Sequence, residues 1–351
     1  MSTRSIGRPH TVLALVVASF ALAACGGGGD GGSSDKTGTL RVGITDAPVD
    51  EAAHVVVEFA GVELKPRGGR AFTLEFKDPA TGNPVTKQID LLAYQGDDRA
   101  VLLDGEQVPA GEYEWMRLMV NAEPGVVDSY IELELGGGSC ELQIPSGAET
   151  GLKMIRGLTV AAGTTTDFTI DFDLRKSVVQ PPGQQTGQMT CDGQAYLLKP
   201  VVRLVDNLQV GTIGGAVDPT LIATACAATP DKAGKVYLYG PYAANDPIPD
   251  GVPDDVDGDS EGEAATDGPD PLDSAIVDPA TGAYLFGFVQ AGSKYALAYT
   301  CDEDDSMIDA DAADAPAGAD EVVEFTAPDP DAAVTVQAGQ ALRVDFNLPT
   351  A

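Results

Sequence analysis

The sequence predicts an all-β protein built from two antiparallel β-sandwich domains in tandem, behind a lipoprotein signal peptide and a flexible tether. Short segments of alternating apolar and polar residues recur along the chain, and this period of two is typical of half-buried strands. Gly (41) and Pro (24) are abundant, as turns between short strands require. No stretch of ten or more residues has the apolar spacing of an amphipathic helix. The expected parts are a signal peptide (1–24), a tether (25–37), a first sandwich (38–207) and a second sandwich (208–351).

The first 25 residues have the three parts of an export signal. Arg4 and Arg8 precede the apolar run 11–24, which at 14 residues is shorter than the roughly 20 needed to span a bilayer. Leu22-Ala23-Ala24-Cys25 resembles the bacterial lipobox, which implies cleavage before Cys25 and lipidation of that residue. Gly26 resembles the residue that follows the cysteine in lipoproteins sent to the outer membrane. We therefore expect an outer-membrane lipoprotein of a Gram-negative bacterium, facing the periplasm or the outside, and held to the membrane by its lipid.

The strand 166–174 shows the clearest alternation in the chain. One face is apolar and the other is polar, so we expect the polar face to meet solvent. The apolar residues are Phe168, Ile170, Phe172 and Leu174, and the polar residues are Asp167, Thr169, Asp171 and Asp173.

The remaining strands of the first half are read from the same alternation and from the turn residues between them. They are expected at 38–45, 53–64, 72–76, 87–91, 112–120, 130–135, 140–144, 151–156, 195–199 and 201–205.

A second set of strands follows a short junction at 206–212. These strands are expected at 211–217, 235–239, 282–289, 293–300, 321–325, 334–337 and 341–348. The sequence Asp-Pro-Ala-Thr-Gly occurs twice, at 78–82 and at 278–282, and predicts two similar tight turns, because Pro presets φ and Gly tolerates positive φ.

Four cysteines remain after Cys25, and an even number in an oxidising compartment suggests disulfides. Three pairings are open. If each half is a domain, Cys140 pairs with Cys191 and Cys226 with Cys301. Metal ligation is less favoured, since none of these cysteines has a CxxC neighbour or a nearby His.

The formal net charge of −33 argues against nucleic acid as a partner. Removal of residues 1–24, which hold two arginines and no acid, takes the mature chain to −35.

Eleven acids and no Lys or Arg occur in 245–273, and ten acids without Lys or Arg in 302–324. Carboxylates separated by small residues suit Ca²⁺, and the best candidates are Asp255, Asp257, Asp259 and Glu261. The alternative is a solvated acidic loop that binds nothing. We expect no other cofactor.

Catalytic machinery is not found. The only His of the mature chain, His54, lies on an expected strand, which excludes the usual triads and His-rich zinc sites. Gly258-Asp259-Ser260-Glu261-Gly262 fits G-x-S-x-G, but it lies within an acidic loop without the strand, helix and His that a nucleophile elbow needs. We expect no enzyme.

Tyr113 and Trp115 are expected on one face of the strand 112–120, where they could stack on a sugar. The competing interpretation is that both rings pack in the core.

Two family resemblances add to this interpretation. Over 38–206 an ordered set of short motifs resembles the bacterial lipoprotein family called domain of unknown function 4382, which implies a lipid-anchored β-sandwich of unestablished activity. The motifs are Gly43–Pro48, Pro109–Tyr113, Ile144–Gly147, Gly151–Lys153, Asp171–Asp173 with Lys176-Ser177, and Leu198–Pro200. Over roughly 209–348, the runs 282–286 and 291–295 are similar to the carboxypeptidase regulatory-like, transthyretin-type sandwich, which implies a structural or adhesive role.

The function expected from the sequence is that of a non-catalytic, lipid-anchored envelope protein, acting as a binding, adhesive or structural module. The alternative is a carbohydrate-binding accessory lipoprotein. An envelope protein or a glycan is the expected partner, beside the membrane itself.

Overall fold

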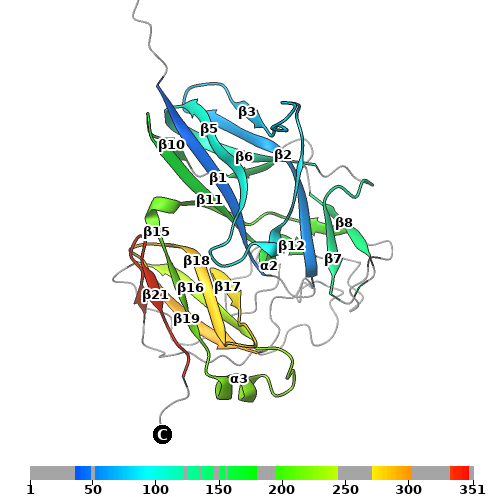
Figure 1. The fold of residues 1–351 in the computed structure, drawn as a ribbon, viewed down its shortest axis with the longest axis vertical. Helices are drawn as coiled ribbons and strands as arrows, with labels where there is room; N and C mark the ends of the chain where they lie inside the picture. The colour runs from blue at the N-terminus through cyan, green and yellow to red at the C-terminus, as the bar shows by residue number, and fades with distance from the viewer. Residues whose placement is uncertain are drawn as a thin grey trace, which may run out of the picture. The chain divides into compact units, whose positions relative to one another are not determined.

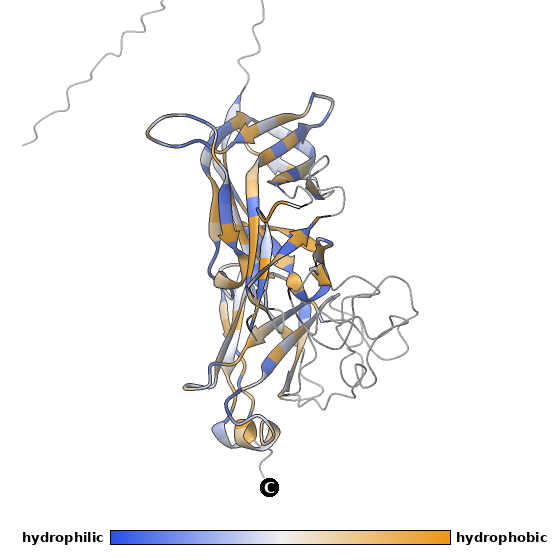
Figure 2. Ribbon diagram, turned by 90° about the vertical axis from the view of Figure 1, so that its right-hand side faces the viewer, coloured by the Kyte–Doolittle hydropathy of each residue, from blue (hydrophilic) through white to orange (hydrophobic). Residues whose placement is uncertain are grey.

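The computed structural model describes residues 36–48, 52–121, 125–134, 136, 138–144, 151–154, 157–179, 191, 195–243, 271–301 and 333–347. Residues 35–351 cluster as one compact unit. Most described residues are in strands, as expected, and Figure 2 shows polar and apolar residues interleaved along them. The described helices are short, and none is long and apolar enough to cross a membrane.

The first group of strands forms two sheets, which can be followed in Figure 1. A four-stranded sheet has the order β14-β11-β1-β5, and a ten-stranded sheet is built around β2 and β6. The four-stranded sheet consists of β1 (Thr37–Ala47), β5 (Ala100–Pro109), β11 (Thr165–Asp173) and β14 (Val202–Asp206). The larger sheet consists of β2 (Ala52–Pro66), β3 (Phe72–Glu75), β4 (Lys87–Asp90), β6 (Gly111–Asn121), β7 (Tyr130–Leu133), β8 (Ser139–Gln143), β9 (Leu152–Met154), β10 (Leu158–Val160), β12 (Val178–Val179) and β13 (Tyr196–Leu198). Two single turns connect them, η1 (Leu91–Ala93) and α2 (Leu174–Ser177).

The second group also forms two sheets, with orders β18-β15-β21 and β17-β16-β19-β20. Its strands are β15 (Val210–Ala216), β16 (Lys235–Tyr242), β17 (Asp273–Ile276), β18 (Ala283–Gln290), β19 (Lys294–Thr300), β20 (Val334–Thr335) and β21 (Ala341–Arg343). The short turns are η2 (Asn207–Gln209), which joins the two groups, and α3 (Pro219–Ala225). Asp218 caps α3 by accepting a hydrogen bond from the Thr220 amide.

Each group of strands encloses its own hydrophobic core. The first core contains residues between Leu40 and Leu204, and the second contains residues between Ile213 and Phe346. No residue is shared by the two sets, so burial of apolar surface stabilises each group separately.

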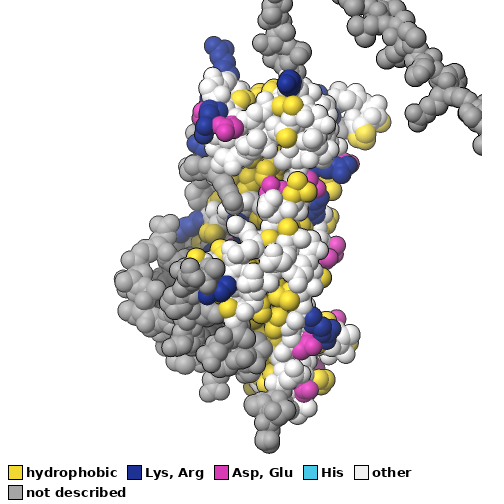
Figure 3. Space-filling view, turned by 90° about the vertical axis from the view of Figure 1, so that its left-hand side faces the viewer, with side chains coloured by type: hydrophobic (Ala, Val, Ile, Leu, Met, Phe, Trp, Pro, Cys, Tyr) yellow, Lys and Arg dark blue, Asp and Glu magenta, His cyan; other side chains and the backbone are white. Residues whose placement is uncertain are grey.

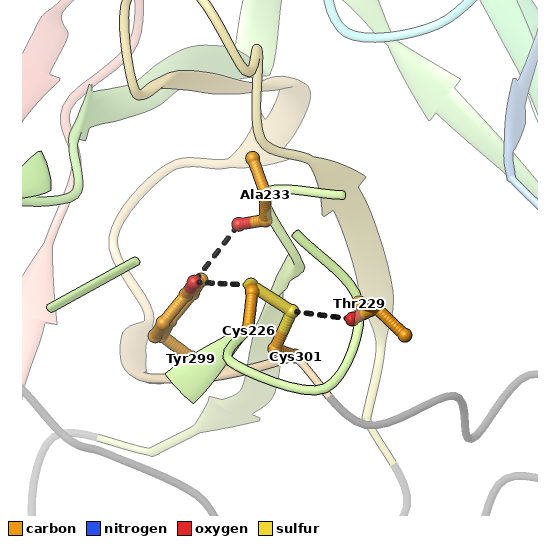
Figure 4. Close-up of a disulfide and its surroundings, with 5 residues drawn as sticks. All are labelled: Cys226, Thr229, Ala233, Tyr299 and Cys301. Carbon is orange, nitrogen blue, oxygen red and sulfur yellow. Dashed lines mark hydrogen bonds between the residues drawn. A yellow bond between two sulfur atoms is a disulfide. The ribbon is translucent and has the colours of Figure 1, made fainter. Parts of the chain in front are cut away.

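One disulfide lies in each group of strands. Cys140 is joined to Cys191, and Cys226 is joined to Cys301, which is the pairing that two domains would give. The second disulfide is buried beside Tyr299 (Figure 4), whose hydroxyl donates to the Ala233 carbonyl and lies 3.5 Å from the Cys226 Sγ. Each disulfide closes a loop of more than 50 residues, which restricts the unfolded chain.

The two Asp-Pro-Ala-Thr-Gly segments form the same turn. In each, the Asp side chain accepts hydrogen bonds from the amides two and three residues later and from the Thr hydroxyl. Gly82 and Gly282 have φ of 71° and 72°. The prediction of two similar turns agrees with these contacts.

The sequence led us to expect purely antiparallel sheets, but three pairs of the described strands are parallel. β1 pairs with β11 in parallel, as do β8 with β13 and β15 with β21. Three strands of the first half were not predicted, β5, β10 and β12, and one of the second, β17. β5 pairs with β1 through two irregularities, at Leu40/Arg41 and Val42/Gly43, which explains why its sequence lacks a clean alternation.

Candidate functional site

The middle of the polar face of β11 is buried and Asp167 and Asp173 at its ends are only partly exposed, so the prediction that this face meets solvent is wrong. Thr169 and Asp171 are 0% and 5% exposed. The sequence pattern shows which residues share a face of a strand, but it does not show what covers that face.

Three carboxylates of this face are each paired with an arginine. Asp167 accepts two hydrogen bonds from Arg99, at 2.7 and 2.8 Å. Asp173 accepts two from the fully buried Arg175, both at 2.8 Å. Asp171 forms an ion pair with Arg203. These two-pronged contacts satisfy the carboxylates that β11 buries.

Arg203 lies between the two groups of strands. It comes from β14, it binds Asp171 on the neighbouring β11, and its Nη2 is 3.4 Å from the Asp273 Oδ2. Asp273 begins β17, which belongs to the second group. Arg175 reaches the same segment, with its Nη2 3.4 Å from the Pro271 carbonyl oxygen. The buried Arg175 and the partly exposed Arg203 therefore join the two groups of strands.

A further aspartate is buried without a partner. Asp46 is 4% exposed, and neither carboxylate oxygen has a hydrogen-bond partner. It follows Leu40, Val42 and Ile44 at the spacing of two that places them on the core side of β1, and it is in register with Phe172. An ionised carboxylate in such a place would be very unfavourable.

We call Asp46, Asp171, Asp173, Asp273, Arg175 and Arg203 the Asp–Arg cluster. Burial raises the pKa of Asp46 well above its usual range, and the charges of Asp171, Asp173 and Asp273 raise it further. The Leu174 amide acts in the opposite direction and lowers the pKa of Asp46, although it is not placed to form a hydrogen bond with either carboxylate oxygen. Burial and the charge of Asp171 raise the pKa of Asp273 to about 8, against the opposing effect of Arg203.

The two remaining shifts in the cluster concern the central ion pair. Burial raises the pKa of Asp171, although Arg203 lowers it. Burial alone would lower the pKa of Arg203, but Asp171 and Asp273 raise it overall, so Arg203 stays charged.

The cluster gathers motifs that are far apart in the sequence. The ends of Gly43–Pro48 and Asp171–Asp173 meet because β1 and β11 are parallel neighbours. Ser177 links them to the next motif, since its hydroxyl donates to the Asp173 carbonyl and its own carbonyl accepts from the Lys199 amide. Three of the six motifs that carry the family resemblance therefore meet at this buried site.

A pocket of about 190 Å³ opens beside the cluster. Its polar lining is Asp171, Asp173, Lys176 and Arg203, and Pro271 and Leu272 bring the second group of strands to its wall. The acids at this pocket face basic side chains, so it carries no excess of unpaired negative charge among the described residues.

Sequence reasoning missed the cluster, although one signal was present. Asp46 continues the apolar set of β1 at the spacing of two, and an acid in such a position indicates burial. Nothing local marks Asp273 or Arg203, because their proximity depends on how the two groups of strands meet.

Tyr113 and Trp115 do not form the shared platform that we expected. A β-bulge at Glu114 sets Pro66 opposite Tyr113 but Lys65 opposite Trp115, so the two rings turn to different faces. Tyr113 is buried, and its hydroxyl donates to the Pro109 carbonyl at 2.6 Å.

Trp115 is half-buried and lies among cations. The Arg117 guanidinium carbon is 4.8 Å from the centre of its ring system, and the Lys153 ammonium nitrogen is 5.0 Å away. The sugar-stacking hypothesis therefore rests on Trp115 alone.

His54 lies on β2, as expected, and its Nδ1 is 2.6 Å from the Asp90 Oδ2. This hydrogen bond raises the pKa of His54. The other predicted site residues, Cys25 and the calcium candidates at 255–261, lie outside the described residues. Within the described part of the chain, no three His, Cys, Asp or Glu side chains are arranged to hold a metal ion.

Charged side chains of both signs are interspersed on the face drawn in Figure 3. In several places there, Lys and Arg lie beside Asp and Glu. The acidity of the sequence does not produce a continuous acidic surface on the described residues of this face.

Comparison with known proteins supports the first of the two resemblances. Residues 37–200 match the family model of a domain of unknown function, DUF4382. All six motifs lie within this DUF4382 stretch, and Leu198–Pro200 is at its end. No curated protein matches the chain.

Two solved structures are similar to this chain at low scores. The Bacillus anthracis TIE protein is 9% identical, with a TM-score of 0.17, over 88% of this chain and 33% of its own. A leucine-rich repeat protein from Bacteroides thetaiotaomicron VPI-5482 is 11% identical, with a TM-score of 0.20, over 90% of this chain and 26% of its own. The chain thus spans about a third of the length of the first protein and about a quarter of the second. TM-scores this low carry no argument about its fold or function.

Proposed function

We propose that this chain is an exported, lipid-anchored protein of the bacterial cell envelope, and that it acts as a binding or structural module rather than as an enzyme. The observation that carries the proposal is the pair of disulfides, one in each group of strands. Disulfides persist in oxidising compartments outside the cytoplasm, which agrees with the export signal read from residues 1–25.

The second group of strands has the role of a supporting module in this proposal. Its resemblance to carboxypeptidase regulatory-like sandwiches favours a structural or adhesive role. The buried contact through Arg203 and Arg175 would hold it against the DUF4382 stretch, so the anchored protein would present a fixed surface to its partner.

The non-enzymatic part of the proposal is supported by the chemistry of the titratable groups. The described acids with raised pKa values are buried in the Asp–Arg cluster, where they have structural ion pairs instead of a reacting group. His54 is on an exposed strand face beside Asp90, with no nucleophile among its described contacts. Perturbed pKa values occur in structural ion-pair networks as well as in active sites.

The lipid anchor is tested by replacing Cys25. We expect Cys25→Ser to abolish incorporation of labelled palmitate and to release the full-length protein from membranes into the soluble fraction. Ser34→Ala, in the tether, is the matched control and should remain labelled and bound. Gly26→Asp should keep the label but move the protein from the outer to the inner membrane. Undiminished labelling and retention of Cys25→Ser would refute the proposal.

A further inference from the structure

The contact between the two groups of strands buries more negative than positive charge. The Asp–Arg cluster holds four carboxylates and two guanidinium groups, and each guanidinium already has one carboxylate partner. Asp173 is paired with Arg175 and Asp171 with Arg203, which leaves Asp46 and Asp273 uncompensated. Asp46 has no hydrogen-bond partner, and Asp273 only shares Arg203 at 3.4 Å.

Buried carboxylates that lack a full partner keep a proton. The free energy needed to remove a carboxylate from water exceeds the attraction it gains from an arginine that is already paired. The neutral acid is therefore the stable form. The charged groups around Asp273 include more carboxylates than guanidinium groups, and with burial they raise its pKa, while Lys176 lies at the adjoining pocket. The groups around Asp273 are Asp46 of β1, Asp171 and Asp173 of β11, Arg175 of α2, Arg203 of β14 and, beyond Arg203, Tyr295 of β19.

We propose that the contact between the two groups of strands is proton-linked, holding Asp46 and Asp273 in their neutral form when it is closed and loosening as the pH rises. In the separated state Asp273 would face water and ionise with a pKa near its ordinary value. In the closed state it is buried and its pKa is raised.

The sign follows from the direction of the shift. The pKa of Asp273 is about 8 in the closed state, well above its ordinary value. A group whose pKa is raised on closing stabilises the closed state fully below its ordinary pKa, and this stabilisation is lost as the pH rises from that value to the raised one. The contribution of Asp273 to closure is therefore largest in acid, falls progressively up to about pH 8 and is constant above it. Asp46, whose pKa is raised for the same reason, acts in the same direction.

A second feature brings the two groups of strands close together. A Cβ placed on Gly287 of β18 would lie 2.1 Å from the Gly96 carbonyl oxygen and 2.8 Å from the Asp97 Cα. The two backbones therefore meet there with no room for a side chain. The cluster and this backbone contact are parts of the same boundary, because β1 contacts β17 and the 95–98 loop contacts β18.

The test is hydrogen exchange of the full mature chain between about pH 5 and pH 9.5, corrected for the intrinsic pH dependence of exchange. We expect the protection of peptides covering Thr169–Asp173 and Asp273–Ile276 to fall as the pH rises, and the part of this fall that is due to Asp273 to end at about pH 8. For each proton released on opening, the opening equilibrium should rise about tenfold per pH unit.

Matched variants identify the groups responsible. Asp273→Asn should make the fall shallower, and Asp46→Asn with Asp273→Asn should remove it, because Asn resembles the neutral acid. Asp104→Asn is the control, since Asp104 is exposed and forms an ion pair with Arg41 on the surface, away from the cluster. It should keep the wild-type slope.

Two results would overturn the proposal. One is wild-type protection that does not change with pH over this range, and the other is a double variant with the wild-type slope. If the double variant does not fold, carbon NMR of aspartate carboxyl groups in the wild-type protein decides. At least one carboxyl should titrate above pH 7, and none doing so would refute the proposal.

Discussion

Trp115 is the only tryptophan of the chain, and its surroundings are cationic although the protein as a whole is strongly acidic. Arg117 and Lys153 lie within 5.0 Å of its ring system. Such contacts contribute roughly 0.5–1 kcal/mol each at exposed sites. Local charge, and not net charge, decides which small ions approach a side chain.

Quenching of tryptophan fluorescence reports this local charge. We expect iodide to quench Trp115 more strongly than caesium does, because the anion is attracted by Arg117 and Lys153. Lys153→Met should reduce the difference, whereas Lys36→Met, at the start of the described chain, should leave it unchanged. Stronger quenching by caesium in the wild-type protein would contradict the position of these two cations.

Tyr113 shows at the same scale why residue patterns mislead. The spacing from Tyr113 to Trp115 predicts one shared face, and the bulge at Glu114 separates them. A bulge adds one residue to a strand without a reliable sequence signal, so every face assignment beyond it is reversed.

At the scale of elements, the sequence was most informative where a strand or turn is specified locally. The alternation of β2, β6 and β11 was sufficient to find these strands, and the Asp-Pro-Ala-Thr-Gly turns were recognised from their residues. β17 was missed because its four residues, Asp273–Ile276, show no alternation. The parallel pairing of β1 with β11 could not be predicted, since it joins strands more than 100 residues apart.

The two repeated turns provide a matched pair of substitutions. Ala at Gly82 or Gly282 must adopt positive φ, which costs about 1 kcal/mol. At Gly82 the added Cβ meets open space, whereas at Gly282 it would lie 2.5 Å from the Val217 carbonyl oxygen. We expect Gly282→Ala to lower the free energy of unfolding clearly more than Gly82→Ala does.

Urea denaturation followed by circular dichroism measures this difference. The same Asp side-chain hydrogen bonds are present in both turns, so they cancel in the comparison. Equal losses for the two variants would show that the Val217 carbonyl moves away at little cost.

At the scale of the whole molecule, the two groups of strands are expected to behave as one cooperative unit near neutral pH. Each has its own core and its own disulfide, so each could in principle fold alone. The Asp–Arg cluster and the Gly96–Gly287 contact join them within one compact unit. The sequence pointed to two sets of strands, but it could not show the boundary between them, because that boundary is made of long-range contacts between polar residues.

The measurement that tests this account most directly uses Trp115, which reports only on the first core, together with Gly282→Ala, which lies in the second. Urea unfolding of wild-type protein and variant at pH 7 would be followed by Trp115 fluorescence and by far-ultraviolet circular dichroism. We expect both signals to change at one midpoint and Gly282→Ala to lower both midpoints equally. A Trp115 midpoint that is unmoved by Gly282→Ala, while the circular dichroism splits into two transitions, would contradict the claim that the cluster couples the two cores.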